Sequence, residues 1–131
     1  MKLCDESVTV FNARVDPALG REVYAATVLR GVSWRGEAAS AVESGGMRVA
    51  DRVVVRIPEG VDAGGKVYVS PEGYRRAGEV GGLWTLQKGD FVLRGVAADV
   101  EEPWSAGAAV VLGVSDNRRG RLGRHWKVVG G

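Results

Sequence analysis

The sequence has 131 residues, of which 45% are hydrophobic and 26% charged, and its formal net charge is +2. This length and composition are typical of one globular domain with one core and exclude the apolar-poor class of disordered chains. The apolar runs are far shorter than the ~20 residues of a membrane-spanning helix. Asp5 and Glu6 precede any apolar stretch, so we expect no secretory signal and a single cytoplasmic domain over residues 1–131.

The sequence contains one cysteine, Cys4, and one histidine, His125. A single cysteine cannot form an intramolecular disulfide, and the two residues are too few for a structural zinc site. His125 is the one candidate base for Ser-His-Asp or Cys-His catalysis, and its neighbours are typical of the start of a strand. We therefore expect no metal, no cofactor and no enzymatic activity.

The first half of the chain predicts several strands. Alternating polar and apolar residues indicate a half-buried strand over residues 7–12 and a longer one over 21–34, with a bend at Gly31. In the longer strand, Tyr24, Ala26 and Val28 share one face, which we expect to be the apolar, buried face. A weak strand is expected over 37–43. Over 48–57 a further strand is predicted. It places Val49, Val53, Val55 and Ile57 on one face and Arg48, Arg52 and Arg56 on the other.

The second half predicts one short helix and further strands. Ser70 and Pro71 follow a short strand at 66–69 and favour a helix of one or two turns to Arg76, because serine caps helices and proline suits the first helical position. Strands are predicted over 83–86, 91–94, 108–114 and 126–129, with a turn at 88–90. Together these elements predict an all-β fold, a small barrel or sandwich of about seven short antiparallel strands with at most one short helix.

The segment Gly60–Lys66 fits the first seven positions of a phosphate-binding loop. The eighth position is Val67, which has no hydroxyl to hold magnesium, and a strand is predicted after it in place of the required helix. We interpret this segment as a glycine-rich loop.

Positive charge is concentrated near the C-terminus. Residues 115–131 hold five cations and one acid, a net +4, which leaves −2 for residues 1–114. Four of the cations, Arg118, Arg119, Arg121 and Arg124, lie in a predicted hairpin loop at 115–124. Arginines in such a loop suit DNA phosphates or an acidic protein surface equally, and a solvated loop is the third reading. We hypothesise that the loop is an interface element that assembly orders.

An acidic segment is the counterpart of this loop. Asp99, Glu101 and Glu102 precede Trp104, and this segment could contact the arginine loop of a neighbouring copy. The alternative is a plain surface loop with Trp104 folded onto the core. Trp34, Trp84 and Trp126 occupy strand positions and are predicted to pack in the core.

Several segments together resemble the small head-tail joining, head-closure or minor capsid proteins of tailed phages and prophages. Those segments are Val8–Asn12, Val32–Trp34, Asp51–Pro58, Tyr68–Pro71, Trp84–Asp90, Ser115–Gly120 and His125–Val129. The resemblance implies a structural virion protein, assembled in the bacterial host cytoplasm, whose β-barrel joins a homo-oligomeric ring between head and tail. The implied partners are other connector and tail-completion proteins and packaged double-stranded DNA. Residues 36–46 and 96–107 depart from the family pattern.

Two other readings remain open. One is a small OB-like nucleic-acid-binding barrel, which would interleave aromatic and basic residues on a strand face. Arg48, Arg52 and Arg56 supply the cations, but no aromatic residue alternates with them. The other is a capsid-associated minor protein.

Overall fold

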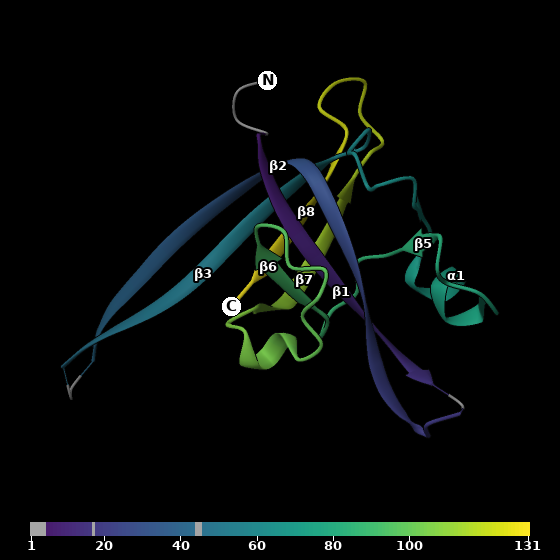
Figure 1. The fold of residues 1–131 in the computed structure, drawn as a ribbon. Helices are drawn as coiled ribbons and strands as arrows, with labels where there is room; N and C mark the ends of the chain where they lie inside the picture. The colour runs from purple at the N-terminus through teal and green to yellow at the C-terminus, as the bar shows by residue number, and fades with distance from the viewer. Residues whose placement is uncertain (1–4, 17, 44–45) are drawn as a thin grey trace.

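The computed structural model describes residues 5–16, 18–43 and 46–131, with the side chains of residues 37–51 left out of the description. Cys4 and the side chains of Arg48 and Val49 lie outside the described residues. Six antiparallel strands form a closed barrel in the order β1-β2-β3-β8-β7-β6 (Figure 1). They are β1 (Glu6–Asp16), β2 (Arg21–Glu43), β3 (Gly46–Pro58), β6 (Phe91–Arg94), β7 (Ala109–Asn117) and β8 (His125–Gly130). The predicted small all-β fold is confirmed.

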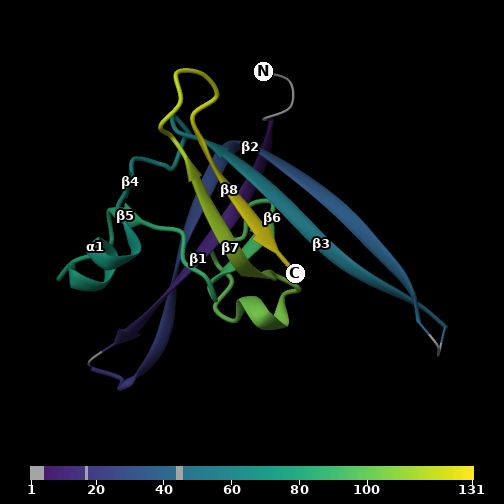
Figure 2. The ribbon, with the colours of Figure 1, turned by 180° about the vertical axis from the view of Figure 1, so that it is seen from behind.

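A long connection between β3 and β6 packs against the barrel. It contains β4 (Val67–Tyr68), α1 (Pro71–Arg76) and β5 (Leu83–Trp84), and β4 pairs with β5 in parallel. The predicted turn at Lys88 and Gly89 is present, and it leads from this small sheet into the barrel. A single 3-10 turn, η1 (Pro103–Ser105), follows β6. The short helix and the small sheet lie on one flank of the barrel (Figure 2).

Local signals set α1, and its predicted bounds are confirmed. The Ser70 hydroxyl accepts a hydrogen bond from the Gly73 N–H at 3.1 Å, which satisfies one of the free amides of the first turn. Pro71 occupies the first turn, where no N–H partner is needed. Glu72 pairs with Arg76 one turn later at 2.9 Å.

The strand β1 is buried on both faces, so the prediction of a half-buried strand is wrong. Val8 and Val10 point into the core, and Thr9 and Phe11 on the other face are equally buried. The segment after β6 explains the difference, because the Thr9 hydroxyl donates to the Gly95 carbonyl and accepts from the Ala97 N–H, each at 2.9 Å. A chain segment that is distant in sequence therefore covers the outer face.

The strand β2 changes phase at Gly31, where the predicted bend is found. Gly31 has a φ of +90°, and the β1–β2 register shifts there, with Glu6 opposite Val32 and Ser7 opposite Arg30. Before this bulge the buried residues are Thr27 and Leu29, and after it Val32 is buried. The predicted apolar phase is therefore wrong before Gly31 and right after it, because one extra residue exchanges the two faces.

The far parts of β2 and β3 leave the barrel as a two-stranded ribbon. The weak strand predicted at 37–43 is the continuation of β2, and its ladder with β3 runs to the pair Glu43 and Gly46. The strand β8 pairs with β3 only from Val53 onward. The backbone of residues 36–43 and 46–52 therefore extends away from the barrel as an arm (Figures 1 and 2).

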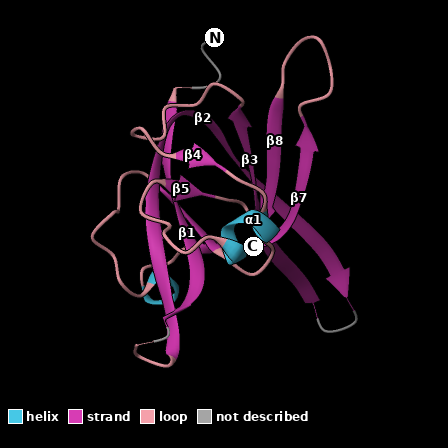
Figure 3. Ribbon diagram, turned by 90° about the vertical axis from the view of Figure 1, so that its right-hand side faces the viewer, coloured by secondary structure: helices cyan, strands magenta, loops and turns pink. Residues whose placement is uncertain are grey.

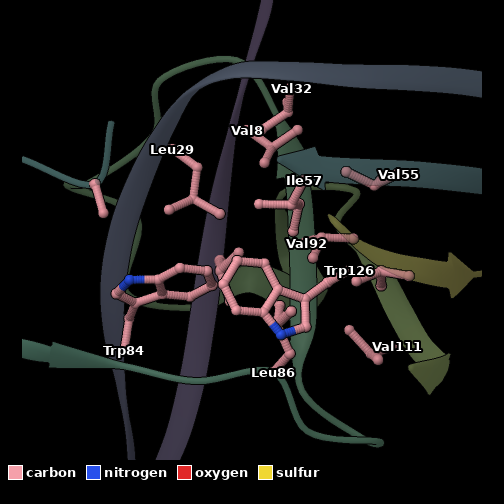
Figure 4. Close-up of a cluster of buried hydrophobic side chains, with 13 residues drawn as sticks. Val8, Leu29, Val32, Val55, Ile57, Trp84, Leu86, Val92, Val111 and Trp126 are labelled. Carbon is pink, nitrogen blue, oxygen red and sulfur yellow. The ribbon is translucent and has the colours of Figure 1, made fainter. Parts of the chain in front are cut away.

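The barrel interior is filled by aliphatic side chains and two tryptophans (Figure 4). Its members are Val8, Val10, Leu29, Val32, Val55, Ile57, Ala63, Trp84, Leu86, Val92, Val111, Trp126 and Val128. The rings of Trp84 and Trp126 meet edge to face, with centroids 5.4 Å apart. Trp84 comes from the β3–β6 connection, which therefore contributes to the core. The predicted core positions of Trp84 and Trp126 are confirmed, and Trp34 is partly buried against the same cluster.

Candidate interaction surfaces

The basic loop between β7 and β8 stands at one end of the barrel (Figure 1). It is shorter than predicted, because β7 continues to Asn117 and leaves residues 118–124 to the loop. Arg119 and Arg121 are exposed, and among the described residues neither forms an ion pair. Leu122 between them and Arg124 is 92% exposed. The tip of the loop thus combines free positive charge with one bare apolar side chain.

Arg118 differs from its neighbours because the barrel holds it. Two of its guanidinium nitrogens donate to the two Asp116 carboxylate oxygens at 2.8 and 2.7 Å. The same guanidinium lies 4.6 Å from the Trp126 ring centroid and 5.1 Å from that of Tyr68. This hydrogen bonding lowers the pKa of Asp116. Arg118 therefore stabilises the base of the loop.

Arg124 fixes the other end of the loop. Its Nε donates to the Gly120 carbonyl at 2.8 Å, and its Nη1 lies 3.5 Å from a Glu59 carboxylate oxygen. Its own carbonyl accepts from the Glu59 N–H at 3.0 Å. Of the four arginines predicted as one interface group, two thus have intramolecular partners and two remain available to another molecule.

The acidic segment lies at the opposite end of the barrel. Asp99, Glu101 and Glu102 are exposed in the connection between β6 and β7, and Trp104 belongs to η1. In the view of Figure 1, this connection runs along the barrel from β6 to η1, and η1 and the β7–β8 loop lie at opposite ends. A contact between the two charged segments, as predicted from the sequence, would therefore join two copies and stays a prediction.

Trp104 stands on an aromatic platform. Its ring centroid lies 5.6 Å from that of Tyr24 on β2 and 6.3 Å from that of Phe91 on β6. Trp104 nevertheless remains 56% exposed, so it is not folded into the core. Burial of the Tyr24 ring and a hydrogen bond between its hydroxyl and Glu22 raise the pKa of Tyr24 to about 12. Sequence reasoning missed Tyr24 and Phe91, whose distance along the chain hides their contact.

A buried polar network lies beside an open cleft of about 990 Å³. The Asp90 carboxylate accepts from Asn12 Nδ2 at 3.0 Å, from Gln87 Nε2 at 2.8 Å and from the Ala13 N–H at 3.2 Å. Asn12 also donates to the Thr85 carbonyl at 2.8 Å. Desolvation raises the pKa of Asp90 despite these donors. The network fastens β1 to the β3–β6 connection, and the sequence carries no signal for it.

Lys66, the lysine of the glycine-rich segment, is fixed against β2. Its Nζ donates to the Ala26 carbonyl at 2.8 Å and to the Thr27 hydroxyl at 3.0 Å, and burial lowers its pKa. The segment leads into β4, as predicted, and not into a helix. These bonds give Lys66 a structural role in anchoring the connection.

No group of three or more His, Cys, Asp or Glu side chains in the described part of the chain is arranged to hold a metal ion. None of the described helices is long and apolar enough to cross a membrane.

Comparison with known proteins places the chain in one family. No curated protein and no solved structure matches it. A family model described as a family of unknown function, DUF6751, matches residues 3–131. The match covers the whole barrel, both charged segments and the ribbon, and the chain belongs to the DUF6751 family.

Proposed function

We propose that this chain is a structural subunit of a tailed-phage head-tail connector, of the head-closure type, which acts by assembling into a ring between head and tail. It performs no chemistry in this role. Its partners are further copies of itself and the neighbouring connector and tail-completion proteins.

The observation that carries the proposal is the ribbon formed by β2 and β3. Over residues 36–43 and 46–52 each strand pairs only with the other, so within the described residues both outer edges keep free N–H and C=O groups. An isolated two-stranded ribbon is marginally stable in water, and exposed strand edges readily pair with another chain. An arm of this kind is expected in a subunit whose neighbours cover it.

Two further observations support assembly. The basic and acidic segments occupy opposite ends of the barrel, which suits contacts between unlike surfaces of successive copies (Figure 3). The segments that resemble head-tail joining proteins include Asp51–Pro58 of β3 and Ser115–Gly120 of the loop. They therefore include the start of the basic loop and the barrel end of the ribbon, whereas residues 36–46 and the acidic segment depart from the family pattern.

The nucleic-acid-binding alternative has less support. Binding barrels of the OB type stack bases on exposed aromatic rings of a strand face. On β8 the ring of Trp126 points into the core, and the Trp34 ring on β2 packs against the same cluster. The cations Arg56 on β3 and Lys127 on β8 face each other. The tryptophans on the neighbouring positions pack against the core and do not stand beside these cations on the outer face.

The test is deletion of the coding gene from a phage or prophage that carries it. We expect DNA-filled heads and separate tails in electron micrographs, and restoration of joined particles by the gene supplied in trans. A gene in which a Gly-Gly turn replaces residues 37–51 should fail to restore them, although circular dichroism shows a folded barrel. Normal infectious particles without the gene would refute the connector role.

A further inference from the structure

The β7–β8 loop and η1 each present an exposed apolar side chain close to charged residues. At the basic end Leu122 is 92% exposed and lies between Arg121 and Arg124 in sequence. At the acidic end Trp104 is 56% exposed and follows Glu101 and Glu102. Trp104 forms a contiguous aromatic patch with the partly exposed Tyr24 and Phe91, and an apolar patch rimmed by polar residues is typical of an interaction site.

The acidic end is already shaped as a platform. Pro103 is buried and fixes η1, and its carbonyl accepts from the Ala106 and Ala108 N–H groups at 3.1 and 3.2 Å. The Trp104 ring is supported by Tyr24 and Phe91, whose own centroids are 5.6 Å apart. A side chain that docks here would meet a surface that needs little ordering, which favours association.

The basic loop also needs little ordering on binding. Arg118 and Arg124 fix its two ends to the barrel, as described above, so only the tip between them has to be ordered on contact. Arg119 and Arg121 are free to face acids, since no ion pair among the described residues involves them. The loop and the platform thus match in apolar content and oppose each other in charge.

We propose that the β7–β8 loop of one copy docks on the aromatic platform of a second copy, with Leu122 against Trp104 and with Arg119 and Arg121 facing Asp99, Glu101 and Glu102. This inference rests on the proposed assembly role and names the surface that performs it. Because the two surfaces differ, the contact is head-to-tail, and repetition produces a ring when the rotation closes.

A charge exchange tests the contact. One purified full-length variant carries Arg119→Glu and Arg121→Glu, and the other carries Glu101→Lys and Glu102→Lys. Each variant alone should be monomeric in sedimentation at concentrations where the unaltered chain associates, because loop and platform then carry like charges. An equimolar mixture should associate again, because both contacts between the two variants pair opposite charges.

Matched variants test the apolar part. Leu122→Ser should weaken association by about tenfold or more, while the control Arg75→Glu, Lys88→Glu, with the same charge change as the arginine pair, should leave it unaltered. An unaltered chain that stays monomeric, or a mixture of folded charge variants that stays monomeric, would overturn the inference. Loss of binding to a 30-base-pair duplex in the arginine variant, without change in association, would assign the loop to DNA.

The outcomes are separable from those of the gene deletion. Self-association through these surfaces is measured without particles, so it stands if the connector role fails. If the deletion blocks joining but Leu122→Ser leaves association unchanged, the connector role stands and this contact is rejected.

Discussion

The barrel interior and the two barrel ends differ in how their side chains are buried and paired. Inside, each apolar side chain is buried against others and the Asp90 carboxylate has three hydrogen-bond donors. At the ends, Leu122 and Trp104 remain exposed, and Arg119 forms no ion pair with an acidic side chain within the described residues. The interior therefore provides most of the stability of the fold, and the exposed side chains at the ends can change without unfolding it. Substitutions in the two regions should separate stability from association.

The largest effect is expected in the barrel wall. Val55 is fully buried between β2 and β8, so Val55→Asp places an unpaired carboxylate in the core and should lower the free energy of unfolding by more than about 4 kcal/mol. Arg52→Ser on the same strand is exposed and should be nearly neutral. Urea unfolding followed by circular dichroism measures both, and equal tolerance of the two would contradict the burial of this face.

The second effect concerns the buried network. Asp90→Ala removes the acceptor of the Asn12 and Gln87 amides and of the Ala13 N–H, which should lower stability by about 3 kcal/mol. The exposed Asp99→Ala serves as control and should change little. A loss for Asp90→Ala no greater than for the control would show that the network does not fasten β1 to the connection.

Asp90 and Asp116 should also give opposite pH dependences. Burial raises the pKa of Asp90, so its contribution to stability is full below the unfolded value of 3.8 and is lost as pH rises through the raised pKa. Arg118 lowers the pKa of Asp116, so that contribution is present above 3.8 and is lost as pH falls. Thermal midpoints of Asp90→Asn and Asp116→Asn, compared with the unaltered chain between about pH 3 and 6, should therefore deviate with opposite slopes. Slopes of one sign would contradict the assignment.

A smaller effect separates the arginines at the basic end. Arg118→Ala removes the contacts with Tyr68, Trp126 and Asp116 and should cost about 1–2 kcal/mol. Arg119→Ala should cost almost nothing, because no partner in the described chain depends on it. Tryptophan fluorescence should change in the first variant only. If both variants behave alike, the division between structural and available arginines fails.

The smallest effect belongs to the helix cap. Ser70→Ala leaves the Gly73 N–H without its side-chain acceptor and should cost about 1 kcal/mol. Ser70→Thr retains an acceptor and should recover most of this loss in thermal unfolding. A loss that threonine does not recover would point to a role other than capping.

How far the sequence predicts the molecule depends on whether the signal is local. The bounds of α1 follow from Ser70 and Pro71 alone, and the prediction is confirmed. The prediction of which face of β2 is buried was wrong before Gly31, because a bulge is defined by the register with β1 and not by the pattern of β2 itself. The sequence pattern of one strand thus predicts that the strand exists better than it predicts which of its faces is buried.

The surfaces show the same limit. Arg118 and Arg119 look alike in the sequence, and the folded structure separates them because Arg118 pairs with Asp116 and lies over the rings of Trp126 and of Tyr68, fifty residues earlier. The acidic segment was recognisable from its composition, but its platform joins β2, β6 and η1 and requires the closed barrel.

The most direct measurement is site-specific cross-linking between copies. In a Cys4→Ser background, one chain carries Gly120→Cys in the loop and another Ser105→Cys beside the platform, so that Leu122 and Trp104 stay in place, and the two are mixed with a short thiol-specific cross-linker. We predict covalent dimers in the mixture and almost none from either variant alone, because the contact joins the loop of one copy to the platform of the next. Dimers formed equally by each variant alone, or an absence of dimers in the mixture, would contradict head-to-tail assembly through these ends.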